Sequence, residues 1–253
     1  MFRLRQIGVL GGLGAVLVVP ALACAAQTDW RDIESRVQYA WYTEDARDLA
    51  AVANRLRELP DSDALRSYYL TLTRLREAQV LQAGRSADQA AVGRAASGCI
   101  DFADEALAAR PTDAEVLALQ SLCMELRSRA RAVDVPFTAA RSRTQMQKAL
   151  QLAPKNPRVR LLAAQLAYAS ARSTQERAQL LGSFQSAVDA FELEREGLEK
   201  IPGWGAAEAW QGLALVYLDR GDAIAARSAL EHALLLVPDF KSAHRLLDHI
   251  LKG

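Results

Sequence analysis

The sequence predicts an all-α protein built from repeated helical hairpins, and three observations lead to this prediction. Ala, Leu, Arg, Glu and Gln are abundant, whereas only 14 of the 253 residues are Gly and 8 are Pro. Such side chains favour helix because they lose little rotamer freedom there. No segment alternates apolar and polar residues convincingly enough to predict a strand. Prolines recur behind similar helical segments, which indicates repeated units.

The prolines and the polar turns around them divide the chain into helices. A proline lacks the N–H that continues a helix and restricts the residue before it, so each one marks a stop. The clearest stops, Pro111, Pro154 and Pro238, each follow an Ala-Leu pair, and Pro60 and Pro202 are weaker copies. Caps and breakers together predict helices over residues 29–42, 44–58, 62–82, 86–109, 113–131, 138–152, 157–171, 174–200, 205–219, 222–236 and 240–251.

The predicted helix over residues 174–200 is unusually long. Ser173 and Glu176 have the spacing of a capping box, which satisfies free N–H groups at a helix start. The pair Gly182-Ser183 is a candidate bend within this helix. Ala132–Pro136 is the clearest internal loop, although it is too short for a linker between domains.

Nine residues between Ala207 and Asp239 agree in type and spacing with one repeat of a known family. They are Trp210, Leu213, Ala214, Tyr217, Gly221, Ala226, Leu230, Ala233 and Pro238. The segment resembles a tetratricopeptide repeat (TPR), a helical hairpin of 34 residues. The resemblance implies a right-handed superhelix of about five TPR-like hairpins over residues 28–253, with a C-terminal capping helix. Before this segment the proline stops are 43 to 51 residues apart, so the other repeats are longer and less regular.

The TPR resemblance also implies a binding groove, because the first helix of each TPR hairpin lines a concave surface that holds a protein or peptide partner. The corresponding residues here are Leu122, Glu125, Leu161, Gln165, Tyr168, Gln211, Leu215, Leu218 and Asp219. The Lys and Asn clamp of heat-shock co-chaperone TPRs is not reproduced, because Gln211 and Leu215 stand at two of its positions. The mixed lining favours a helix or an extended peptide over an acidic C-terminal tail.

Residues 1–25 have the anatomy of a secretory signal peptide. Arg3 and Arg5 precede the apolar run Ile7–Val19, and small residues follow Pro20. The run is shorter than the ~20 residues of a membrane-spanning helix, and the rest of the sequence contains no apolar run long enough to span a membrane. We therefore expect an exported protein of the bacterial periplasm.

Cys24 leaves an alternative open. Ala23-Cys24-Ala25 suits ordinary signal peptidase, whereas Leu22-Ala23-Cys24 resembles the lipobox at which bacterial lipoproteins are lipidated. Ala21 stands where a lipobox usually carries a bulky aliphatic residue. The alternative is therefore a TPR lipoprotein of the outer membrane that assists assembly of an envelope machine.

Cys99 and Cys123 are candidates for a disulfide. They lie at equal distances from the turn at Pro111, so an antiparallel hairpin would bring them to the same level. A bridge requires Cα atoms within ~7 Å, which small neighbouring residues allow. Those neighbours are Ala95, Ala96, Ala103 and Ala106. Export favours the bridge, and the alternative is a pair of buried free thiols.

No pattern of catalytic, cofactor-binding or metal-binding residues is recognisable. The nucleophile-elbow, P-loop and dinucleotide-binding motifs are lacking, and His244 and His249 lie five apart, a poor spacing for a shared metal. Without Arg3 and Arg5, 29 of the 31 basic residues remain against 30 acidic ones, so no nucleic-acid partner is expected. We expect a protein-binding scaffold without catalysis, and the alternative is a helical enzyme or an enzyme's accessory domain.

Overall fold

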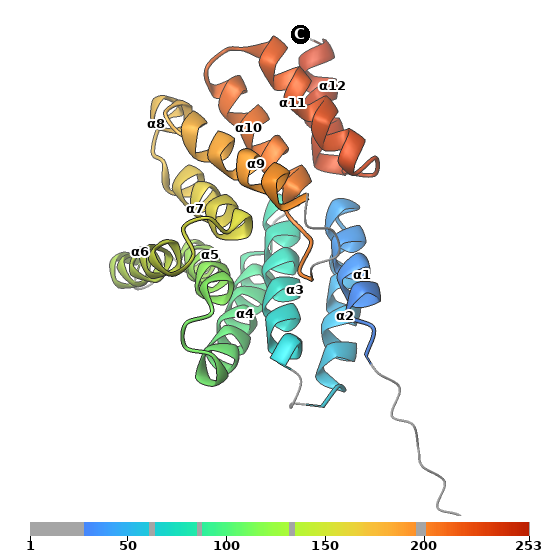
Figure 1. Cartoon of the computed structure of the whole chain (residues 1–253), viewed down its shortest axis with the longest axis vertical. Helices are drawn as coiled ribbons and strands as arrows, with labels where there is room; N and C mark the ends of the chain where they lie inside the picture. The colour runs from blue at the N-terminus through green and yellow to red at the C-terminus, as the bar shows by residue number, and fades with distance from the viewer. Residues whose placement is uncertain (1–27, 61–63, 85–87, 132–134, 196–200, 253) are drawn as a thin grey trace, which may run out of the picture.

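The computed structural model describes residues 28–60, 64–84, 88–131, 135–195 and 201–252. Within these ranges the chain forms twelve helices and no strand, so the all-α prediction is confirmed. Figure 1 shows the helices following one another in chain order from α1 and α2 at one end of the molecule to α11 and α12 at the other. The helices are α1 (Trp30–Tyr42), α2 (Ala46–Arg57), α3 (Ala64–Ala83), α4 (Gln89–Ala109), α5 (Ala114–Arg131), α6 (Val135–Leu152), α7 (Pro157–Ser170), α8 (Thr174–Ala178), α9 (Leu181–Arg195), α10 (Ala206–Asp219), α11 (Ala223–Leu236) and α12 (Lys241–Lys252).

The prediction of one long helix over residues 174–200 is wrong. The chain turns at Gln179 and Leu180, whose N–H groups donate to carbonyl oxygens three residues earlier at 3.2 and 3.0 Å. The turn lets α8 pack against α10 while α9 packs against both α7 and α10. Gly182 therefore lies inside the first turn of α9 and does not bend a longer helix. The end of the prediction, residues 196–200, lies outside the described residues.

Two helix starts differ slightly from their predictions. Ser173 accepts the expected hydrogen bond from the Glu176 N–H at 3.1 Å, but the Glu176 carboxylate accepts from the Arg172 N–H, one residue earlier than in a capping box. Pro136 lies in the first turn of α6 and not in a loop. A proline is tolerated there because the first N–H groups of a helix have no partner within it. The preceding residues 132–134 of the predicted loop lie outside the described residues.

The helices pack as five hairpins: α1–α2, α3–α4, α5–α6, α7–α9 and α10–α11, with α12 against α11. The first helices of neighbouring hairpins also contact one another, because α3 packs on α5, α5 on α7 and α7 on α10. They form a continuous inner layer, which is the arrangement that positions the site described below. The handedness of the superhelix stays a prediction.

The hairpin α10–α11 has the packing expected from its repeat-like sequence. Ala214, Ala226 and Ala233 are buried together with Leu213, and α10 packs extensively against α11. Gly221 connects them in the left-handed conformation with φ of +77°, which side chains other than glycine rarely adopt. The residue types at these positions therefore follow from close helix contact and from the turn.

A disulfide joins Cys99 of α4 to Cys123 of α5, and the predicted bridge is present in the structure. Their Cα atoms are 6.0 Å apart. Both cysteines are fully buried, and the alanines on the α4 side are buried with them. The bridge therefore fixes α4 against α5, a helix of the inner layer.

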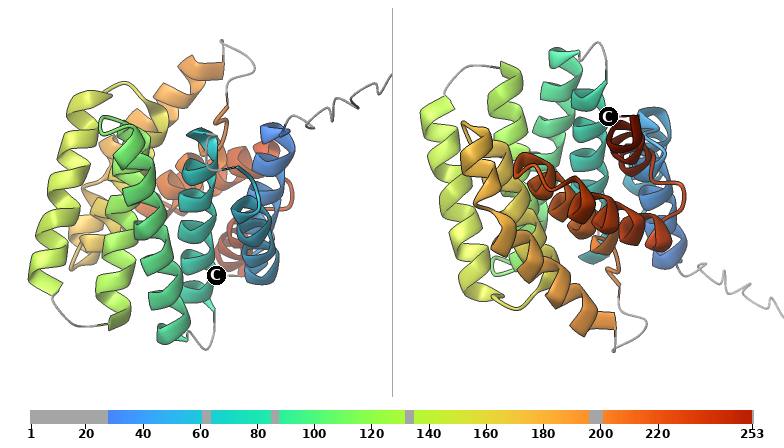
Figure 2. Two further views of the ribbon diagram at one scale, coloured as in Figure 1. Left: turned by 90° about the horizontal axis from the view of Figure 1, so that it is seen from below. Right: turned by 90° about the horizontal axis from the view of Figure 1, so that it is seen from above.

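The end of α1 meets the start of α12, which the sequence did not predict. The rings of Tyr42 and Phe240 pack edge to face with centroids 4.7 Å apart. Lys241 donates to the Thr43 carbonyl oxygen at 2.7 Å, and α12 lies beyond the end of α1 in Figure 1, so that the two overlap when the molecule is seen from above in Figure 2. No helix in the described ranges is both long and apolar enough to cross a membrane.

Candidate binding groove

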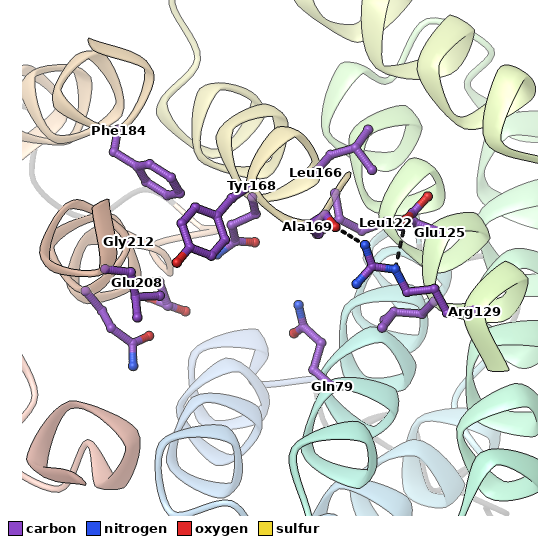
Figure 3. Close-up of a pocket in the computed structure, with 14 residues that line it drawn as sticks. Gln79, Leu122, Glu125, Arg129, Leu166, Tyr168, Ala169, Phe184, Glu208 and Gly212 are labelled. Atoms are coloured by element: carbon purple, nitrogen blue, oxygen red, sulfur yellow. Dashed lines mark hydrogen bonds and ion pairs between the residues drawn. The ribbon is translucent and has the colours of Figure 1, made fainter. Parts of the chain in front are cut away.

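A pocket of about 160 Å³ opens on the inner layer, where α3, α5, α7, α9 and α10 approach one another. Figure 3 shows Phe184, Tyr168 and Gly212 on one side of it, Leu122, Leu166 and Arg129 on the other, and Gln79 between. The complete lining is Gln79, Leu122, Glu125, Leu126, Arg129, Gln165, Leu166, Tyr168, Ala169, Phe184, Glu208, Gln211, Gly212 and Leu215. We define these residues as the groove pocket.

The structure brings six of the nine predicted groove residues together around this pocket. They are Leu122, Glu125, Gln165, Tyr168, Gln211 and Leu215. They come from α5, α7 and α10, which lie side by side in the inner layer. The repeat register therefore places these side chains on one surface, whereas their role in binding stays a prediction.

Three predicted groove residues lie elsewhere. Leu161 is fully buried and does not line the pocket. The chain before α10 covers it, because a Cβ added to Gly205 would lie 3.2 Å from Leu161 Cδ2. Leu218 and Asp219, at the end of α10, do not line the pocket. The Asp219 carboxylate instead accepts a hydrogen bond of 2.6 Å from the Tyr168 hydroxyl, which fixes a side chain that does line it.

Several residues of the groove pocket were not predicted from the sequence, for identifiable reasons. Gln79 belongs to α3, for which no groove positions were assigned, and Phe184 comes from the second helix of a hairpin. Gly212 carried a usable signal, since a glycine inside a helix costs roughly 1 kcal/mol relative to Ala. Glycine is required at position 212 because a Cβ there would overlap the Phe184 ring.

Every charged side chain of the groove pocket has a partner of opposite charge. Arg129 pairs with Glu125 at 2.9 Å and also donates to the Ala169 carbonyl oxygen, so α5 is tied to α7. Figure 3 shows both interactions at the rim. At the other end, Glu208 pairs with Arg76 at 2.6 Å, and both side chains are almost completely buried.

The Glu208–Arg76 pair belongs to a buried aromatic cluster behind the pocket. The Arg76 guanidinium lies between the rings of Trp41 and Trp204, 4.5 and 4.9 Å from their centroids. The Tyr42 hydroxyl donates to Glu208 at 2.8 Å. Burial, and then the charge of Glu208, raise the pKa of Tyr42 well above its usual value, so it remains a donor. The cluster joins α1, α3 and α10 and closes the groove on this side.

Tyr168 is held in place by charged groups outside the pocket. Burial raises the pKa of Asp219, but hydrogen bonds from Arg177 and Tyr168 outweigh that effect, so its pKa is lowered overall. Arg177 also lies over the Tyr168 ring at 5.5 Å. The ring is thereby positioned from two sides, and its face toward the pocket remains available.

A second network holds the chain just before α10. The Trp204 indole N–H donates to the Tyr68 hydroxyl at 2.9 Å, and that hydroxyl donates to Glu115 at 2.7 Å. Glu115 also accepts a hydrogen bond from Arg158 at 2.9 Å, and Arg158 donates two further hydrogen bonds to the Glu194 carboxylate. Buried charges of this kind are costly unless every one is paired, so the network specifies one arrangement of the inner layer.

Comparison with known proteins identifies the fold but no family. No family model and no curated protein matches the chain. The HusA haemophore from Porphyromonas gingivalis has 20% sequence identity and a TM-score of 0.58, over 75% of this chain and 92% of HusA. A thermophilic TPR protein of Thermus thermophilus has 15% identity and a TM-score of 0.59, over 88% of this chain and 99% of that protein. The chain thus has a TPR-like helical fold, and the likeness extends no further than the fold at these identities.

Proposed function

We propose that this chain is an exported TPR-like scaffold that binds a segment of another protein in the groove pocket, without catalysis of its own. The observation that carries the proposal is the pocket itself. It lies on the inner layer of hairpins and gathers six residues selected beforehand from the repeat register. The TPR-like fold supports protein binding as the general role.

The size of the pocket favours a protein segment over a small molecule. Sites for small molecules and cofactors usually occupy ~300–1,000 Å³. The groove pocket has about 160 Å³, enough for a side chain but small for a cofactor. One structural neighbour is a haemophore by name, and the small volume of the groove pocket is the reason not to extend that property to this site.

The proposed export has two supports. One is the signal-peptide pattern of residues 1–25, and the other is the Cys99–Cys123 disulfide, because such bonds persist mainly in oxidising compartments. Soluble periplasmic and lipid-anchored forms are distinguished by mass spectrometry of the mature N-terminus. A diacylated Cys24 would establish the lipoprotein, whereas an unmodified chain beginning at Ala26 or Gln27 would establish the soluble form.

Site-specific photocrosslinking in the producing cells tests the binding role. A photoreactive amino acid replaces Gln211 in the groove pocket, and a matched control replaces Gln147, which is exposed on α6. We expect an adduct of defined mass from position 211 and none from position 147. Adding Leu215→Trp, which fills the pocket, should remove the adduct. Equal adducts from both positions, or none from position 211, would reject the proposal.

A further inference from the structure

The groove pocket has room for one ring-sized group. A protein cavity of roughly 150 Å³ lined by Leu, Ile and Phe is known to hold benzene. The groove pocket has about 160 Å³ and a similar lining, contributed by Leu122, Leu166, Leu215 and Phe184. Its dimensions therefore match a single side chain of phenyl size.

Two aromatic rings in the wall favour an aromatic guest. Tyr168 and Phe184 meet edge to face, with centroids 6.2 Å apart and planes at 78°. A third ring entering beside them can adopt the offset or edge-on contacts that aromatic pairs prefer. Because the Phe184 ring packs against the backbone of Gly212, where a Cβ would not fit, this wall is preformed.

The charged side chains of the groove pocket are already paired with each other or with a neighbour, so none is available to bind a charged ligand. Glu125 and Arg129 neutralise each other, and Glu208 is neutralised by Arg76. A carboxylate or an ammonium entering the pocket would lose its hydration without gaining an unpaired counter-charge. The pocket should therefore select an uncharged group.

Three glutamines on three different helices, Gln79, Gln165 and Gln211, complete the lining. Arg76 already donates to the Gln79 side-chain oxygen, and Gln211 donates to Ser242. The Gln165 side-chain oxygen is buried and has no hydrogen-bond partner within the part of the chain that the structure describes. Each glutamine amide therefore retains an unused hydrogen-bond donor or acceptor. A neutral peptide group can pair with either, because it carries an N–H donor and a C=O acceptor.

We infer that the groove pocket accepts one uncharged aromatic side chain, of the phenylalanine type, from a partner segment whose flanking peptide groups meet the three glutamine amides. The inference rests on the proposed function and specifies the ligand chemistry of the same site. It excludes a free C-terminal carboxylate as the recognised group.

The test is a nuclear magnetic resonance titration of the full mature chain with two probes. N-acetyl-L-phenylalaninamide carries a phenyl ring and two neutral peptide groups, and N-acetyl-L-phenylalanine differs in carrying a free carboxylate. We expect the side-chain amide signals of Gln79, Gln165 and Gln211 to move with the first probe. The second probe should bind at least ~10-fold more weakly, which corresponds to ~1.4 kcal/mol.

Matched variants locate the binding. Leu215→Trp fills the pocket and should abolish the shifts, whereas Leu235→Trp makes the same change on α11, where that side chain is 80% exposed. Circular dichroism checks that both variants fold, and Ala169→Leu at the pocket rim replaces Leu215→Trp if the latter does not. Glu125→Gln frees Arg129 from its carboxylate, so the charged probe should regain much of its lost affinity in that variant.

The outcomes separate this inference from the proposed function. Equal affinity for the two probes, no saturable shift, or binding that survives pocket filling would overturn the inference. If groove-specific crosslinking at position 211 is still observed in that case, the scaffold role stands and only the ligand chemistry is wrong. If crosslinking is lost as well, both proposals fail.

Discussion

Opening the Cys99–Cys123 bridge should lower the stability of the fold by an amount that can be worked out from the structure. The bridge closes a loop with a sequence separation of 24. The chain-entropy relation for such a loop gives ~3.4 kcal/mol at 25 °C. Because domains are typically stable by only ~5–15 kcal/mol, the loss is roughly a fifth to two thirds of a typical total.

The assay is urea unfolding of the mature protein, followed by circular dichroism, with and without a thiol reductant. With a slope of ~2–3 kcal/mol per M, the reduced protein should unfold at a urea concentration ~1–2 M lower than the oxidised protein. The variant that carries both Cys99→Ala and Cys123→Ala should resemble the reduced protein and ignore the reductant. It controls for effects of the reductant on the rest of the chain.

Oxidised and reduced midpoints that differ by less than ~0.3 M, with the bridge present in one sample and absent in the other by mass spectrometry, would refute a stabilising role of the bridge. Such a result would mean that α4 and α5 hold each other equally well without the covalent link. A response of the double variant to the reductant would show that the shift does not come from this disulfide.

Two further predictions concern the groove and the cluster behind it. Gly212→Ala should destabilise the fold by ~1–3 kcal/mol because the added Cβ overlaps the Phe184 ring. Gly182→Ala is the control: no atom lies within 4 Å of its added Cβ, so it should stabilise the fold by ~0.5–1 kcal/mol. Melting temperatures of the two variants that shift in the same direction would contradict the packing explanation. Arg76→Met should cost ~3–5 kcal/mol because it leaves Glu208 buried without its counter-charge. Combining it with Glu208→Leu should recover most of that loss in urea unfolding, and a double variant as unstable as the single one would show that the ion pair is not the cause.

The helices were predictable because their limits depend on neighbouring residues. Asp29 and Asp45 cap α1 and α2 with side-chain hydrogen bonds to the first N–H groups, and such caps can be recognised in the sequence. The split between α8 and α9 was not predictable in this way. It depends on how both helices reach α10, which is a property of the packed hairpins.

Groove residues could be predicted from the sequence where their spacing along a single helix determines which side chains face the groove. Gln165 and Tyr168 lie three residues apart on α7 and therefore share a face. Leu161 shares that face but is covered by the chain around Gly205, some forty positions later. Gln79 entered the pocket only because α3 approaches α10, and no local pattern carries that information.

The contacts of α1 and α3 with the C-terminal helices change how this protein should fold. In an open repeat array each unit touches only its neighbours, so folding can begin anywhere and spread. Here Tyr42 and Glu208 bond across 166 positions, and Arg76 and Glu208 across 132. Contacts of such long range form late and slow the reaction. The protein should therefore gain or lose structure as one cooperative body, and removing either terminal hairpin should open the remainder instead of yielding a shorter, stable array.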